Sequence, residues 1–114
     1  RRTSVGLRVV KGDSEGTSLG PIQLRFDAKV ASVGSGEKNQ FCIPGLEEEH
    51  GMISYIGDQL LYVNSSDSRT VIDGKPIDLD AGPVEIGNGS TIILGESTEL
   101  SLTSFTDFID PATD

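Results

Sequence analysis

The chain has 114 residues, a length that predicts one domain with a modest hydrophobic core. Its net charge is −9, with seven Lys/Arg against four Asp/Glu in residues 1–40 and two against fourteen in residues 41–114. Because such a surface repels nucleic acid, we exclude DNA and RNA and favour a protein partner with a basic surface; an acidic face that only aids solubility is the alternative. No apolar run approaches about 18 residues, which excludes a membrane-spanning helix.

Short alternating segments rich in β-branched residues follow one another along the chain, separated by turn residues. The predicted strands are Val5–Val10, Ile22–Phe26, Lys29–Gly34, Gln40–Ile43, Gly51–Ile56, Gln59–Asn64, Thr70–Ile72, Lys75–Ile77, Val84–Ile86, Thr91–Leu94 and Thr98–Thr103. Gly57-Asp58 and Asp73-Gly74 are predicted two-residue hairpin connections, and Asn88-Gly89 is predicted to join its two neighbouring strands. About ten or eleven short antiparallel strands without a helix of ten residues predict an all-β sandwich.

The two ends differ from the body. We expect the sandwich to span residues 1–103 and residues 104–114 to form an acidic, aromatic tail. Phe105, Phe108 and Ile109 stand at helical spacing before Pro111, which predicts one amphipathic turn packed on the sandwich. The alternative is a docking segment for a partner.

Residue types that carry catalysis or bind metals are sparse. Cys42 is the only cysteine, and its neighbours Phe41 and Ile43 predict a buried side chain with no intrachain disulfide. His50 is the only histidine, so no Cys/His metal cluster exists. The serines near residue 66 have no partner His or acid in a triad-like motif and indicate a turn, and residues 78–80 indicate a strand edge. We therefore predict a protein that is not an enzyme and needs no cofactor or metal.

Several short motifs occur in a specific order. Val33-Gly34 ends a predicted strand, and the stretch from Leu46 to His50 directly precedes another. Ser66 and Thr70 then precede Asp73-Gly74, and Asn88-Gly89 opens the final motif, which ends at Gly95. Together these resemble a forkhead-associated (FHA) domain from about Leu7 to Thr103. The resemblance implies a phosphothreonine-reading β-sandwich in which His50 braces loops and Gly34, Gly74 and Gly89 have structural roles.

The sequence departs from this family at the positions that hold phosphate. Ser35 stands where the family has Arg, and Glu47, followed by Glu48 and Glu49, stands where the family has Ser. The family's Asn-Gly, whose Asn holds the peptide backbone, is replaced by Ser68-Arg69. Each lost charge-assisted hydrogen bond costs about 1.5–3 kcal/mol. We therefore expect no useful phosphothreonine affinity.

The sequence thus predicts a non-catalytic protein-interaction module that serves as an accessory subunit of a larger complex. The predicted partner-binding residues are Ser35, Glu37, Glu47, Glu48, Glu49, Ser66, Ser68, Arg69, Phe105 and Phe108. The alternatives are an active phosphopeptide reader that uses Arg69 with backbone amides, and the regulatory domain of a longer enzyme such as an epoxidase.

A second resemblance concerns the cellular setting. The residues Pro21–Gln23, Val33-Gly34-Ser35 and Tyr62-Val63 are similar to the FHA domain of plant zeaxanthin epoxidases, which are plastid proteins. With the Arg1-Arg2 start, this favours the plastid stroma and peripheral docking on a photosynthetic membrane complex. The cytoplasm is the alternative setting.

Overall fold

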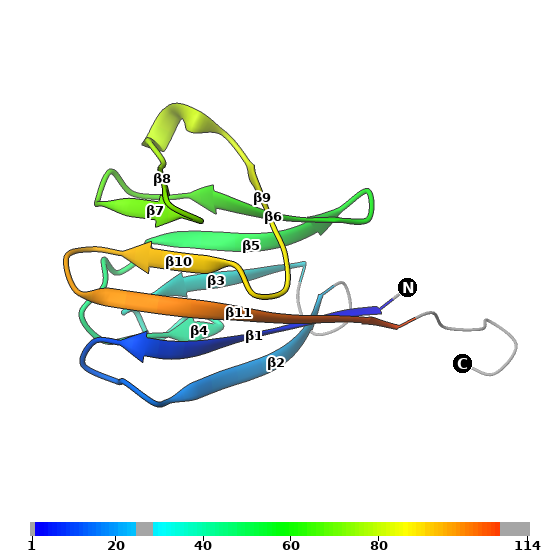
Figure 1. Ribbon diagram of the computed structural model, residues 1–114, viewed down its shortest axis with the longest axis horizontal. Helices are drawn as coiled ribbons and strands as arrows, with labels where there is room; N and C mark the ends of the chain where they lie inside the picture. The colour runs from blue at the N-terminus through cyan, green and yellow to red at the C-terminus, as the bar shows by residue number, and fades with distance from the viewer. Residues whose placement is uncertain (1, 25–28, 108–114) are drawn as a thin grey trace, which may run out of the picture.

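Two β-sheets face each other in the computed structural model, which describes residues 2–24 and 29–107 (Figure 1). One sheet has six strands in the order β2-β1-β11-β10-β7-β8, and the other has five in the order β4-β3-β5-β6-β9. The strands are β1 (Arg2–Lys11), β2 (Ser18–Leu24), β3 (Val30–Gly34), β4 (Phe41–Cys42), β5 (Gly51–Ile56), β6 (Gln59–Asn64), β7 (Thr70–Ile72), β8 (Lys75–Pro76), β9 (Val84–Ile86), β10 (Thr91–Leu94) and β11 (Thr98–Asp107). The predicted all-β sandwich is confirmed.

The core lies between the inner faces of the two sheets. Alternate residues of each strand point inward, as the period of two in the sequence requires. On β1, for example, Val5, Leu7 and Val9 are buried, and their neighbours face outward. Tyr62 and Phe41 are the largest fully buried side chains, so aliphatic residues fill most of the interior.

Five strands, β5, β6, β7, β9 and β10, have the bounds predicted from the sequence. The predicted hairpin turns at Gly57-Asp58 and Asp73-Gly74 are also confirmed. Gly57 and Asp58 have φ values of 58° and 65°, and Asp73 and Gly74 have 50° and 84°. Positive φ at both central residues is the geometry of the type I′ turn, which suits the right-handed twist of a hairpin.

The connection at Asn88-Gly89 differs from the prediction. It follows β9, which belongs to the five-stranded sheet, and leads to β10, which belongs to the six-stranded sheet. The turn therefore carries the chain between layers and is not a hairpin. One further pair departs from the antiparallel pattern, because β3 and β4 run parallel.

Two local predictions are wrong. Cys42 is exposed, because it alternates with the buried Phe41 and Ile43 on a short edge strand. The predicted strand edge at residues 78–80 is instead the start of a 3₁₀ turn, η1 (Leu79–Ala81).

The chain also does not leave the sandwich at residue 103. Strand β11 continues to Asp107 because residues 104–107 pair with the start of β1. Phe105 therefore lies on a strand and not on a helical turn. Phe108, Ile109 and Pro111 lie outside the described residues. Within those residues, no helix is long and apolar enough to cross a membrane.

Candidate functional site

Three loops gather at one end of the sandwich. They follow β3 (residues 35–40), β4 (residues 43–50) and β6 (residues 65–69), on the left in Figure 1. The paired residues Arg2 and Asp107 lie at the opposite end of the sandwich. The loop end is therefore free of the strand termini that begin β1 and finish β11.

A buried polar network holds the loop end together. His50 is fully buried, and its Nε2 lies 3.3 Å from Thr70 Oγ1. The Thr70 hydroxyl lies 3.0 Å from Asn64 Oδ1, and the Asn64 amide donates to the carbonyl of Ile77 at 3.2 Å. Burial lowers the pKa of His50 below its usual 6.5, opposed by the backbone of Arg69 and the charge of Glu47. His50 therefore lies within this buried network, and its lowered pKa favours the neutral imidazole.

Gly34 allows the loop after β4 to pack directly on the end of β3. A Cβ at this position would lie 2.9 Å from the carbonyl oxygen of Glu47 and still closer to that of Glu48. These two carbonyls accept hydrogen bonds from Ser35 N at 2.9 Å and Gly36 N at 3.1 Å. The loops after β3 and β4 are thus joined backbone to backbone, and only glycine fits between them.

A second contact joins the loops after β4 and β6. The Ser68 hydroxyl donates to Glu47 Oε1 at 2.6 Å, a length typical of a bond to an ionised carboxylate. The neighbouring Arg69 contacts the loop after β10, where its Nη1 donates to the carbonyl of Gly95 at 3.3 Å. Arg69, the cation of the loop after β6, is therefore engaged with a backbone carbonyl.

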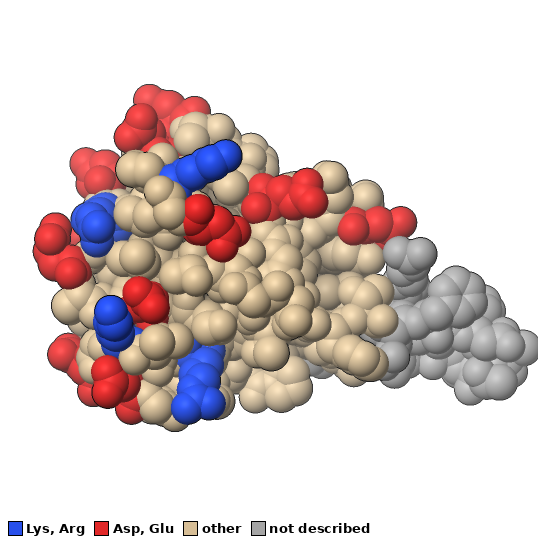
Figure 2. All heavy atoms as spheres, in the orientation of Figure 1, with Lys and Arg blue, Asp and Glu red and all other residues tan. Residues whose placement is uncertain are grey.

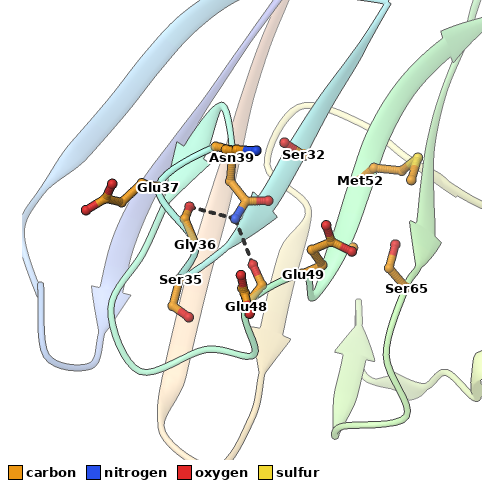
Figure 3. Close-up of a pocket in the computed structure, with 11 residues that line it drawn as sticks. Ser32, Ser35, Gly36, Glu37, Asn39, Glu48, Glu49, Met52 and Ser65 are labelled. Carbon is orange, nitrogen blue, oxygen red and sulfur yellow. Dashed lines mark hydrogen bonds between the residues drawn. The ribbon is translucent and has the colours of Figure 1, made fainter.

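Beside these contacts lies an open pocket of about 840 Å³. Its lining comprises Ser32, Ser35, Gly36, Glu37, Lys38, Asn39, Glu48, Glu49, Gly51, Met52 and Ser65 (Figure 3). Three of these residues are acidic and one is basic. The half-buried Met52 supplies an apolar side, and Glu49 lies between it and Glu48. The pocket therefore combines negative charge with an apolar surface.

The wall of this pocket is preformed. The Asn39 side chain donates to the carbonyls of Gly36 and Glu48, each at 2.8 Å (Figure 3). The Ser32 hydroxyl donates to Gln40 Oε1 at 2.8 Å. These bonds fix the loop after β3 in place without using the carboxylates of Glu48 and Glu49.

The structure brings together most of the residues predicted from sequence. Ser35, Glu37, Glu48 and Glu49 line the pocket, although the Glu37 side chain points away from the other labelled residues. Glu47, Ser66, Ser68 and Arg69 lie on the adjoining loops. The Ser66 hydroxyl is buried and has no hydrogen-bond partner among the described residues.

Other predicted residues lie elsewhere. Gly74 and Gly89 occupy turns with φ of 84° and 87°, and Phe105 lies on the six-stranded sheet. Phe108 lies outside the described residues.

Sequence reasoning missed Ser32, Asn39, Met52 and Ser65. Their contribution depends on which strand faces and loops meet in space, which no local motif records. Within residues 2–24 and 29–107, no group of three or more His, Cys, Asp or Glu is placed to hold a metal ion.

Of the comparisons with known proteins, the one with solved structures identifies the fold. The sequence matches no protein-family model and no curated protein. Its fold is similar to an FHA domain from a study of phosphothreonine-dependent FHA interactions, with TM-score 0.65 and 26% identity over 88% of this chain and 95% of that one. It is also similar to the FhaA FHA domain solved with the intracellular domain of Rv3910, with TM-score 0.64 and 26% identity over 87% and 99%. An FHA domain of an Arabidopsis thaliana hypothetical protein has TM-score 0.75 and 22% identity over 94% and 90%.

Proposed function

Because the chain is an FHA domain, a protein-interaction module, we propose that it binds its partner without reading phosphothreonine and takes a basic segment at its acidic loop end. In this role it serves as a non-catalytic accessory subunit of a larger complex.

The observation that carries this proposal is the hydrogen bond between Ser68 and Glu47. These residues stand where the resemblance places the family's peptide-holding Asn and a phosphate-holding Ser. Here they bind each other at 2.6 Å, so the chain supplies its own anion at that place. A phosphate arriving beside Glu47 would be repelled by up to about 4 kcal/mol at 4 Å near a protein surface. Arg69, which could offset this repulsion, points toward Gly95 instead.

The adjoining pocket supports a cationic ligand. The side chains of Glu37, Glu48 and Glu49 are exposed, and Lys38 is the single cation of the lining. Lys and Arg side chains pack their aliphatic stems on apolar surface while their charged ends reach acidic groups. Met52 and Glu49 offer this combination side by side (Figure 3). A Lys- or Arg-containing segment of a partner protein therefore suits the pocket better than a phosphopeptide.

Peptide binding tests the proposal. We would titrate the protein with one Lys/Arg-rich peptide containing a threonine, in unmodified and phosphorylated forms. The unmodified form is expected to bind, more weakly at high salt, and phosphorylation is expected not to help. Glu48→Gln with Glu49→Gln should weaken binding about two- to thirtyfold, from about 0.2–1 kcal/mol per exposed charge pair. Asp78→Asn with Asp80→Asn, which removes two exposed charges outside the pocket, is the matched control.

Tighter binding of the phosphorylated peptide would contradict the proposal, as would equal losses of affinity in the pocket and control variants.

A second variant tests whether Ser35 and Glu47 are the reason that phosphothreonine is not recognised. Ser35→Arg with Glu47→Ser restores the family's residues at two positions. It should create at least about a tenfold preference for the phosphorylated peptide, because each charge-assisted bond contributes about 1.5–3 kcal/mol.

A further inference from the structure

A second surface lies on the outer face of the six-stranded sheet, where β1, β2 and β11 run side by side. It contains a hollow of about 230 Å³. The residues around the hollow are uncharged: Ser4, Gly6, Ser18, Leu19, Gly20, Pro21, Thr103 and Phe105. In Figure 2 much of this face is tan, and Arg8, which pairs with the lining residue Ser18, carries a charge at its border.

The hollow exists because small residues meet there. Gly6 pairs with Thr103 of β11, and the register of β1 against β2 shifts between Val5 and Leu7, beside Gly6. A Cβ on Gly6 would already lie 3.2 Å from the carbonyl oxygen of Leu19. Glycine therefore leaves open a depression that most side chains would fill.

An exposed aromatic ring stands beside this hollow. Phe105 pairs with Ser4 across β1 and β11, and its side chain is 65% exposed. An aromatic residue left in water on a sheet face forgoes the burial that makes Phe a strong contributor to interfaces. One face thus carries both an unburied ring and an unfilled depression.

We propose that this face is a self-association surface, on which Phe105 of one copy enters the hollow of a second copy and receives the second copy's Phe105 in return. A twofold interface requires one patch that is complementary to itself, and a ring beside a matching depression meets that requirement. The volume suits the occupant, because a cavity of about 150 Å³ holds a benzene ring. Because the lining is uncharged, no like charges of the two linings face each other directly at the contact.

Sedimentation velocity over a concentration series, in about 0.15 M salt so that the Debye length is near 8 Å, tests this proposal. The unaltered protein is expected to form a reversible dimer. Phe105→Ala should raise the dimer Kd about a hundredfold or more, because two rings are lost per dimer and each is expected to contribute at least tenfold. Ile56→Ala is the matched control, since Ile56 is 61% exposed in the hairpin between β5 and β6.

A substitution that fills the hollow should weaken the dimer, as removal of the Phe105 ring does. Ser4→Leu places a larger side chain in the hollow, and Ser101→Leu makes the same change outside it on the same face. Only Ser4→Leu should prevent the dimer. An equimolar mixture of the Phe105→Ala and Ser4→Leu proteins should recover part of the association, because one ring and one hollow remain compatible.

Three outcomes would overturn the proposal. The first is a protein that stays monomeric at every concentration, and the second is a dimer that survives both Phe105→Ala and Ser4→Leu. The third is association that appears only when the chain is shortened to end at Asp107, which would identify residues 108–114 of the same chain as the occupant.

Discussion

Replacing Gly34 by alanine should destabilise the protein more than the addition of a single methyl group suggests. The added Cβ would lie 2.9 Å from the carbonyl oxygen of Glu47 and closer still to that of Glu48. To make room, the loop after β4 must move away from the end of β3. That movement stretches two backbone hydrogen bonds, from Ser35 N at 2.9 Å and from Gly36 N at 3.1 Å.

The expected loss follows from these contacts. Overpacking costs about 1–3 kcal/mol, and each net hydrogen bond contributes about 0.5–1.5 kcal/mol. Because the loop can relax in part, we expect Gly34→Ala to lower the free energy of unfolding by about 2–4 kcal/mol. It should also weaken binding at the pocket, since Glu48 and Gly36 line it.

Urea unfolding followed by circular dichroism measures this loss as a shift in midpoint at constant slope. Gly87→Ala is the control, because a Cβ at Gly87 meets no atom within 4 Å. Its stability should stay within about 0.5 kcal/mol of the unaltered protein. A Gly34→Ala protein as stable as Gly87→Ala would refute the reasoning, since the close approach of the two loops would then carry no energetic consequence.

Three further predictions concern single residues. Because burial lowers the pKa of His50, the folded state resists its protonation, so His50 contributes stability above pH 6.5 that is lost as the pH falls below that value. In urea midpoints measured from pH 7.5 to 5, His50→Gln should be less stable at neutral pH, and its deficit should shrink on acidification; a constant deficit would contradict this. Asp73→Ala should cost about 2 kcal/mol in thermal or urea unfolding, because Asp73 accepts hydrogen bonds from Thr91 N at 2.9 Å and Ser90 Oγ at 3.1 Å at a φ of 50°. Asp73→Asn should recover at least half of that loss. Cys42 should react with a thiol reagent in the folded protein at a rate close to that in urea, and strong protection would contradict its exposed position.

Much of the fold could be predicted because local patterns were unambiguous. The side chains of β5 and β6 alternate between the two faces of the sheet, and Gly57-Asp58 between them tolerates the positive φ of a tight turn. The bounds and register of the two strands therefore followed from the sequence. Asp73-Gly74 likewise predicted the pairing of β7 with β8, although β8 ends one residue before the predicted end at Ile77. Alternation, however, does not say which strands share a sheet. β9 and β10 therefore appeared to form a hairpin, although they belong to different layers.

The errors arise where distant parts of the chain decide the outcome. Phe105, Phe108 and Ile109 stand at helical spacing, but residues 104–107 pair with the start of β1, which satisfies their backbone groups and keeps them extended. Cys42 has apolar neighbours, and only its place on an edge strand turns it outward. Glu47 and the two acids after it were identified from sequence as a candidate site. The roles of Asn39 and Met52 could not be, because they depend on how a loop folds back over a sheet.

The pairing of Arg2 with Asp107 has a practical consequence for anything joined to this domain. The start of β1 and the end of β11 lie side by side, at the end of the sandwich remote from the loops (Figure 1). A dye, a surface or a host polypeptide attached there would present the loop end outward and unobstructed. The same arrangement would allow the domain to be spliced into a surface turn of another protein with little separation between the two junctions.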